Sequence, residues 1–319
     1  MKIMLIDLNS IGFAAQDGAK LISDGQEVQA VFTFIRTVRR LIKDFPNHKV
    51  ILLDDGKAKW RFDLFPAYKG NRNIDPKRVE EKRKYQLQKP KIIAAMTALG
   101  VDYIMANDHE ADDIAAYLAN TLSKSPKNEI LLISSDRDWI QLVKPNVRWF
   151  CTRFEKLCTY DNMKSIVGYD TPREFLEAKV ITGDGSDNIP GIGGIGETGA
   201  AKLIADYGSV NGFIQKYNKG IEGKLTKPLQ MLADNGVPKE SSKYGVMLPM
   251  RNAYTRNYAL MNLVDLVVSP LSDDRHTRIS GIIDLESFKQ LCWDLNFNSI
   301  LNGFDDFVRP FLVGKTHAG

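Results

Sequence analysis

Histidine, cysteine and long apolar runs are all scarce in this chain of 319 residues, and each shortage excludes a class of protein. The three cysteines, Cys151, Cys158 and Cys292, lack metal-site spacing and cannot form a disulfide framework, so we expect reduced thiols in a core. The four histidines do not cluster, which argues against a zinc hydrolase. No apolar stretch approaches the roughly 20 residues of a membrane-spanning helix, so no membrane segment is expected.

An export signal is also missing, because the chain starts directly with the strand-like MKIMLID. Neither a basic n-region nor an apolar h-region precedes this run, and we therefore expect a cytoplasmic protein. The hydrophobic share of 44% and the charged share of 26% are ordinary for a folded domain. A chain of this length can bury a large core and carry a smaller second domain.

Strand and helix patterns alternate along about the first 185 residues, which predicts an α/β fold with a mostly parallel sheet. The apolar runs 3–6, 50–53 and 130–133 have the composition of buried strands. The expected strands are 2–7, 49–54, 101–105 and 129–134, the expected helices are 28–44, 90–99, 109–123 and 137–143, and a hairpin is expected at 147–160. Asn107 or Asp108 is expected to cap the helix at 109–123.

The composition changes at residue 183, where seven glycines and Pro190 fall within 17 residues, 183–199. Helices are expected at 197–207 and from Ser209 onward. These signals predict a catalytic core at 1–182 and a helical region at 183–260. Residues 261–319 are expected to pack on the core, with a strand at 264–268 and a helix at 286–295.

Nine carboxylates lie in five short clusters, most of which directly follow an apolar run. They are Asp7; Asp54; Glu110, Asp112 and Asp113; Asp136 and Asp138; and Asp184 and Asp187. An acid just past a buried strand lies at the edge of the sheet where α/β proteins bind ligands. Converging carboxylates repel one another unless hard divalent cations such as Mg²⁺ or Mn²⁺ neutralise them. Two such ions about 4 Å apart could clamp the oxygens of a phosphoryl displacement.

Simpler interpretations of the same acids remain open. Residues 110–113 also fit a polar helix start, where acids favour the positive end of the helix dipole. Asp136 and Asp138 also fit an N-cap, and a cap would hold the two carboxylates in position.

A basic block lies between residues 57 and 91, where twelve Lys or Arg and four Asp or Glu leave a charge of +8. The whole chain carries only +4, so the rest is acidic. A basic block beside an acidic site suggests a polyanionic substrate, although a solvated helix face would also explain the run. Of its aromatics, Trp60, Phe62 and Phe65 are expected to pack, and Tyr68 is expected to touch substrate.

The run Gly191-Ile-Gly-Gly-Ile-Gly196 matches G-x-G-x-x-G, but it does not open the first βα turn of the fold, as a dinucleotide site requires. No Lys-Ser/Thr pair follows it, which excludes a P-loop. A glycine-rich hairpin between two helices fits better. Its backbone N–H groups could contact phosphates without obstruction by side chains.

Six segments together resemble bacteriophage 5′-nucleases of the flap endonuclease / 5′–3′ exonuclease family, which includes the 5′-nuclease domain of bacterial DNA polymerase I. The segments are LIDLNS, DDGKAKWR, PAYKGNR, HEADDIAAY, ISSDRDWIQL and GDGSDNIPGIGGIGETGAAKLI, and they span roughly residues 1–210 in the family's order. The resemblance implies a PIN-like α/β core, a basic helical arch at 56–98, and a helix-hairpin-helix-type module of the three-turn variety.

The resemblance also implies site residues and two Mg²⁺ ions, for which Mn²⁺ would substitute. The first ion would be held by Asp7, Asp54, Glu110, Asp112 and Asp113, and the second by Asp136, Asp138, Asp184 and Asp187. Lys69 and Arg72 would act in catalysis by contacting the scissile phosphate. The implied DNA contacts are Tyr68, Lys69, Arg72, Lys82, Arg83, Lys84, Gly191, Gly193, Gly194, Gly196, Thr198 and Lys202. Leu8 and Arg137 stand where the family commonly has glycine.

The implied activity is hydrolysis at 5′ ends and 5′ flaps of branched or nicked DNA, and of RNA in RNA–DNA hybrids, during replication, primer removal or repair. We expect a monomeric, stand-alone nuclease, in the host bacterial cytoplasm if the chain is phage-encoded. A single-strand-binding protein or a clamp as partner stays open. So do two rival functions, a non-catalytic binder of branched DNA and a PIN-type ribonuclease.

Overall fold

The computed structural model describes residues 1–72, 75–221, 223–238, 248–266, 269–271 and 275–313. The chain divides into two compact units. The core unit comprises Met1–Lys57, Asp75–Thr159 and Val267–Gly319, and the helical unit comprises Ala58–Ile74 and Tyr160–Leu266. The helical unit thus begins before residue 183, because the helix at 172–182 packs against later helices.

The core unit is built on a seven-stranded sheet with the order β11-β5-β4-β1-β6-β7-β8. Its strands are β1 (Lys2–Asp7), β4 (Lys49–Asp54), β5 (Asp102–Ala106), β6 (Glu129–Ile133), β7 (Val147–Cys151), β8 (Lys156–Cys158) and β11 (His276–Ile279). The two edge strands pair antiparallel and all other neighbours pair parallel, which confirms the expected mostly parallel sheet. Asp7 pairs with Leu53 and Ile6 with Ile133, so β1, β4 and β6 end level with one another.

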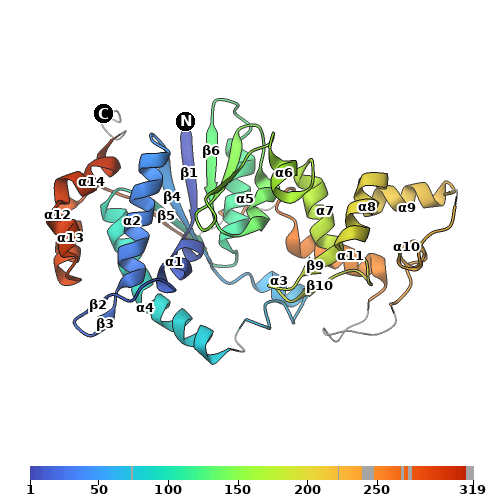
Figure 1. Ribbon diagram of the computed structural model, residues 1–319, viewed down its shortest axis with the longest axis horizontal. Helices are drawn as coiled ribbons and strands as arrows, with labels where there is room; N and C mark the ends of the chain where they lie inside the picture. Colours follow the sequence, from blue (N-terminus) through green and yellow to red (C-terminus); the bar gives the residue numbers. More distant parts are fainter. Residues whose placement is uncertain (73–74, 222, 239–247, 267–268, 272–274, 314–319) are drawn as a thin grey trace. The chain divides into compact units, whose positions relative to one another are not determined.

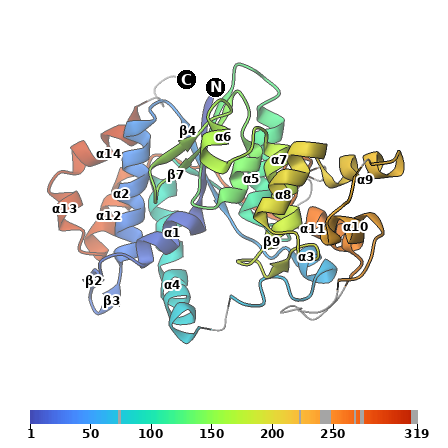
Figure 2. The ribbon, with the colours of Figure 1, turned by 45° about the vertical axis from the view of Figure 1, so that its right-hand side comes forward.

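Helices cover both faces of this sheet (Figure 1). They are α1 (Leu8–Gln16), α2 (Gln29–Asp44), α4 (Pro76–Ala98) and α5 (Ala111–Leu122). Helix α12 (Leu285–Asp294) packs on α4, α14 (Phe304–Leu312) packs on α2, and α13 (Asn298–Leu301) lies between these two. A small hairpin joins β2 (Ile22–Ser23) to β3 (Gln26–Glu27). On one face Met4 and Ile6 of β1 join a buried cluster with Phe34 of α2 and Met96 of α4. Helix α5 contacts four strands and lies on the opposite side of the sheet from α2 (Figure 2).

Several local expectations were wrong for identifiable reasons. Helix α4 starts at Pro76 rather than near residue 90, because Asp75 caps it by accepting a hydrogen bond from Lys77 N at 3.0 Å and Pro76 occupies its first turn. Pro90 therefore lies inside the helix.

Helix α5 is capped by Glu110 and not by Asn107 or Asp108. Residues 137–142 form a 3₁₀ helix, and the described residues 264–266 contain no strand. Residues 267–268 of that expected strand lie outside the described residues.

The helical unit contains α3 (Lys59–Leu64), α6 (Met163–Val167), α7 (Pro172–Thr182), α8 (Glu197–Tyr207), α9 (Val210–Asn218), α10 (Lys227–Ala233) and α11 (Met250–Met261), with a short pair β9 (Gly183–Asp184) and β10 (Ile189–Pro190). Its core gathers Leu176, Leu203, Phe213 and Tyr254 from α7, α8, α9 and α11, together with Ile192 from the segment before α8. The expected helices at 197–207 and after Ser209 are confirmed. No helix within the described ranges is long and apolar enough to cross a bilayer.

Candidate functional site

Asp7 lies where β1 ends and α1 begins, and neutral groups of the chain hold its carboxylate. It caps α1 by accepting a hydrogen bond from Ser10 N at 2.9 Å. Its other oxygen accepts from Ser134 Oγ at 2.8 Å, and Ser134 directly follows β6. The buried carboxylate of Asp7 therefore joins the ends of β1 and β6, which lie level with one another.

Asp54 and Asp55 follow one another at the end of β4 but have different surroundings. Asp54 is 1% exposed, and it accepts from Lys89 Nζ at 2.5 Å and from Tyr103 Oη at 2.9 Å. Asp55 accepts from Asn9 Nδ2 at 2.8 Å and from the backbone N–H of the first residue of α5 at 2.8 Å. The protein's own lysine therefore neutralises Asp54, whereas Asp55 has neutral donors.

The start of α5 contributes three acids in two roles. Glu110 and Asp113 form a reciprocal capping box, and both are buried. Asp112 accepts instead from Trp139 Nε1 at 2.6 Å, which links it to the segment after β6. In that segment Asp136 caps the 3₁₀ helix by accepting from Asp138 N at 2.8 Å. The expected N-cap role of Asp136 is confirmed.

The electrostatics identify which of these acids share one site. Burial, and then the charge of Asp55, raise the pKa of Asp7 to about 7. Burial also raises the pKa of Asp112 well above its usual value, and the charges of Asp136, Glu110, Asp55 and Asp7 add to that effect. We call Asp7, Asp55, Glu110, Asp112 and Asp136 the acid cluster. Each charge on it makes the next more costly.

The acid cluster fits hard cations chemically, because its side chains offer only oxygen donors. Within the part of the chain that the structure describes, no three His, Cys, Asp or Glu side chains already surround a common point as metal ligands. The cluster is therefore a concentration of charge that a cation would stabilise, rather than a preformed coordination sphere.

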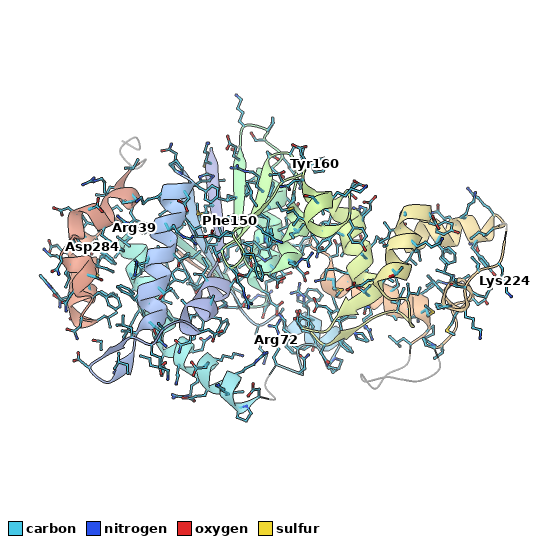
Figure 3. The ribbon with its side chains drawn as sticks, viewed as in Figure 1. Arg39, Arg72, Phe150, Tyr160, Lys224 and Asp284 are labelled. Carbon is cyan, nitrogen blue, oxygen red and sulfur yellow. The ribbon has the colours of Figure 1, made fainter. Side chains whose placement is uncertain are left out.

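The other two predicted ligands, Asp184 and Asp187, lie on the β9–β10 turn of the helical unit and interact with cations of that unit. Burial alone would raise the pKa of Asp184, but Lys179, 2.9 Å away, and Ser186 outweigh it and hold the pKa at about 2. Asp187 forms an ion pair with Arg72, labelled in Figure 3, and lies 3.9 Å from Lys69 Nζ.

The structure brings the predicted catalytic residues Lys69 and Arg72 together with Asp187, and the backbone there is unusual. Lys69 has φ of +54°, a left-handed conformation that a side chain other than glycine adopts at a cost. Its backbone N–H donates to Asp187 O at 2.8 Å, which holds the conformation in place. Such outliers concentrate at functional sites.

Tyr68 does not have the surroundings expected of a residue that touches substrate. Its side chain is only 3% exposed and packs against Phe62, with ring centroids 5.4 Å apart. Its hydroxyl donates to Asp187 Oδ2 at 3.0 Å. Because the ring is buried, no base can stack on it, and Tyr68 instead orients Asp187.

The predicted DNA contacts on α4 differ in exposure. Lys82 and Arg83 are exposed, and Arg83 pairs with Glu80 of the same helix. Lys84 is half-buried and donates to Glu27 at 2.9 Å and to Glu81 at 3.1 Å. Lys84 therefore fixes α4 to β3, a structural role that periodicity alone does not reveal.

The glycine hairpin 191–196 ends at the N-terminus of α8, where Gly196 is the N-cap. Ile192 and Ile195 are buried and anchor it, while Gly193 and Gly194 have φ of +64° and +82°, which favour glycine. Thr198 and Lys202 lie on the exposed first turns of α8 and line a cavity of about 610 Å³ together with Lys224, labelled in Figure 3.

Sequence reasoning missed Asp55, Asn9, Lys89 and Tyr103. The acidic pair at 54–55 was a visible signal for Asp55. The sequence around the other three residues does not reveal their partners. Lys89 lies on α4 and Tyr103 on β5, and Asn9 lies on α1, so the fold alone brings them to Asp54.

Two family models match the chain in sequence. Residues 2–168 match the 5′-3′ exonuclease N-terminal resolvase-like domain, and residues 170–237 match the 5′-3′ exonuclease C-terminal SAM fold. DNA polymerase I of Bacillus subtilis (strain 168) is 30% identical over 243 residues, which cover 74% of this chain and 27% of the polymerase. The chain thus spans about a quarter of the length of that relative.

Solved structures of bacteriophage T5 proteins share the fold. The T5 5′-exonuclease with bound divalent zinc ions has a TM-score of 0.67 at 21% identity, covering 92% of this chain and 100% of the other. A T5 flap endonuclease complex with DNA and metal ions also has a TM-score of 0.67 at 21% identity, covering 93% and 100%. These comparisons confirm the resemblance that the six sequence segments carried, and with it the expected fold.

Proposed function

Since the chain belongs to the 5′-3′ exonuclease family, a family of nucleases, we propose that it is a metal-dependent, structure-specific nuclease acting at 5′ ends and 5′ flaps of branched or nicked DNA. The observation that carries this proposal is the acid cluster at the carboxyl edge of the parallel sheet. Burial, and then the charges of neighbouring acids, raise the pKa values of Asp7 and Asp112 within it. The caps formed by Asp7, Glu110 and Asp136 orient these acids, and a bound cation would offset the charge that they bring together.

Two Mg²⁺ ions, replaceable by Mn²⁺, would supply a water of lowered pKa and neutralise charge on the attacking and leaving oxygens. Asp7, Glu110 and Asp112 remain proposed ligands of the first ion, and Asp55 is added to them. Asp54 and Asp113 would support these ligands indirectly. Asp54 accepts a hydrogen bond from Asn9 Nδ2, and Asp113 accepts one from Glu110 N in the capping box. The assignment of Asp136, Asp138, Asp184 and Asp187 to a second ion rests on their motif positions in the sequence.

The chain's own residues would orient the substrate. Lys69 and Arg72 would contact the scissile phosphate, and both of their cationic groups lie near Asp187. The N–H groups of the glycine hairpin, with Thr198 and Lys202, would bind the DNA backbone without reading sequence. Lys82 and Arg83 would add charge along the arch at 56–98.

The decisive experiment incubates a 5′-labelled flap with the protein in Mg²⁺ and in EDTA, alongside Asp136→Asn and Asp184→Asn. We expect metal-dependent cleavage by the wild type, and loss of cleavage with flap binding retained in both variants. Asp17→Asn, an exposed acid at the end of α1, is the matched control and should cleave normally. Equal rates for the wild type and both variants would refute the ligand assignment.

The same substrates separate the rival functions. A wild type that binds flaps but cuts nothing in Mg²⁺ would be a branched-DNA binder, and preference for unstructured RNA would indicate a PIN-type ribonuclease. We further propose that the protein removes RNA from RNA–DNA hybrids and acts as a monomer in the cytoplasm, that of a bacterial host if phage-encoded. Matched hybrid, nicked and flap substrates test the first of these points.

A further inference from the structure

A buried amide on α11 bonds to both sides of the turn that carries Asp184 and Asp187. Asn257 has no exposed surface. Its Nδ2 donates to Val180 O at 3.1 Å and to Pro190 O at 2.7 Å. Both donor positions of the amide are therefore used, one on each segment that flanks the turn.

The two carbonyls mark the points where the turn begins and ends. Val180 belongs to the last turn of α7, whose final carbonyls have no partner within the helix. Pro190 closes β10. The two segments also approach closely as backbones, because a Cβ built on Gly191 would lie 2.6 Å from Thr182 O. Asn257 holds together the base of the turn.

The other end of the amide connects this turn to the segment that carries Lys69 and Arg72. Asn257 Oδ1 accepts from Arg256 Nη2 at 2.9 Å, and the Arg256 guanidinium lies over the Phe65 ring, 4.6 Å from its centroid. Phe65 directly follows α3. The pair Arg256–Asn257 thus bridges the two segments of the helical unit that carry proposed catalytic groups.

Further hydrogen bonds fix the turn at its tip. Asn188 Nδ2 donates to Ala67 O at 2.7 Å, and Asn71 Nδ2 donates to Gly185 O at 2.7 Å. The turn is therefore fixed at its tip by residues 67–71 and at its base by Asn257. If the base were released, the tip contacts alone would have to set the directions of both carboxylates.

We infer that Asn257 is a positioning residue that fixes the β9–β10 turn so that Asp184 and Asp187 present their carboxylates to a divalent cation. This inference rests on the proposed function and assigns to it a residue 70 positions beyond Asp187. Asn257 touches neither substrate nor ion. It acts through the backbone of the turn.

Asn257→Asp is the sharpest variant, because it keeps the shape and the acceptor for Arg256 but replaces the donor with an oxygen that faces two carbonyls. Tyr254→Phe is the matched control. It lies on the same helix, is also buried, and loses one buried hydrogen bond, to Glu177 Oε1 at 2.8 Å, which does not involve the turn.

Two measurements distinguish positioning from general support of the fold. Hydrogen exchange of the backbone amides of 184–189 should rise at least about tenfold in Asn257→Asp and stay unchanged in Tyr254→Phe, because removing the donor of a buried hydrogen bond leaves its acceptor unsatisfied. Mn²⁺ binding without DNA, followed by electron paramagnetic resonance, should weaken about tenfold in Asn257→Asp only. Cleavage by this variant should recover at raised Mn²⁺.

Equal exchange and equal Mn²⁺ binding in the two variants would overturn the inference. If far-UV circular dichroism shows that Asn257→Asp does not fold, Asn257→Ser replaces it under the same criteria. A wild type that binds no Mn²⁺ and cuts no DNA would refute the proposed function. The exchange measurement tests whether Asn257 holds the β9–β10 turn, independently of that outcome.

Discussion

Replacing Asp7 by Asn should stabilise the metal-free protein, although it removes a proposed ligand. Burial and the charge of Asp55 raise the pKa of Asp7 from 3.8 to about 7. Between these two values the unfolded chain has lost the proton while the folded chain still holds it. The unfolding free energy of the metal-free protein therefore falls as pH rises from about 4 to 7 and stays at the lower level above that.

The size of the effect follows from the distance between the two pKa values. At about 1.4 kcal/mol for each pH unit, ionising Asp7 costs the fold about 4 kcal/mol at pH 8. Asn at this position carries no charge. Its amide oxygen can still accept from Ser10 N, and its NH₂ can donate to Ser134 Oγ once that hydroxyl rotates. We expect Asp7→Asn to recover about 2–4 kcal/mol at pH 8 and nothing near pH 4.

The assay is urea unfolding in EDTA at pH 5, 6, 7 and 8, with tryptophan fluorescence as the probe. The quantity to compare is the difference in unfolding free energy between Asp7→Asn and the wild type, because titrating groups that do not interact with Asp7 cancel in it. Asp17→Asn controls for the loss of one negative charge. A difference that does not grow between pH 5 and 8 would refute the burial argument. Added Mg²⁺ should shrink it by stabilising the wild type alone.

Four further outcomes are expected. Asp112→Asn should lower kcat by at least about a hundredfold with flap binding retained, measured by single-turnover cleavage and gel shift, and normal cleavage would remove Asp112 from the site. Gly12→Ala should lower the unfolding free energy by about 1–3 kcal/mol, because the new Cβ would lie 2.3 Å from the Tyr85 ring, and Tyr85→Leu should relieve that loss in a double-mutant cycle. Lys84 and neighbouring side-chain amides hold the pKa of Glu27 at about 2. The difference in unfolding free energy between wild type and Glu27→Gln should therefore be constant above about pH 5 and shrink as pH falls from 4.5 toward 2. A difference that does not depend on pH would refute this. Flap binding should weaken at least tenfold between 50 and 200 mM salt, and a flat response by fluorescence anisotropy would exclude phosphate contacts as its main source.

The strand ends were predictable from sequence because a buried parallel strand is a continuous apolar run, and an acid that interrupts it must lie at its edge. Which of two adjacent acids faces the site was not predictable in the same way. Asp54 and Asp55 differ in role only because Lys89 and Tyr103 approach one of them from α4 and β5. The start of α4 was missed because its first turns are charged all round, so they carry no apolar stripe for periodicity to detect.

Tyr68 shows a second limit of sequence reasoning. An aromatic beside basic residues is typical of a nucleic-acid surface, yet this ring is buried and its hydroxyl serves Asp187. Burial is a property of the whole helical unit, and neighbours in sequence do not reveal it. The predicted contact of Lys69 and Arg72 with the scissile phosphate stays a prediction, and in the structure both side chains lie near Asp187.

The partners of the acids separate those that the chain neutralises from those that it does not. Asp54 pairs with Lys89, Asp184 with Lys179, and Asp187 with Arg72. Asp7, Asp55 and Asp112 accept hydrogen bonds from neutral donors in the described part of the chain, namely hydroxyl, amide, indole and backbone groups. Neutral donors orient a carboxylate but leave its charge in place, so burial, and then the repulsion between neighbouring acids, raise the pKa values of Asp7 and Asp112.

This division ranks the acids by their demand for an external cation. An ion at Asp184 or Asp187 has to compete with a lysine or an arginine of the same unit, whereas an ion at Asp7 or Asp112 meets carboxylates that neutral groups hold and whose pKa values are raised. The acid cluster should therefore bind the first cation with release of protons below about pH 7, and ions at the turn should bind more weakly. Mn²⁺ titration of Asp112→Asn and Asp187→Asn tests the order: loss of the tighter site in the second variant and not in the first would contradict it.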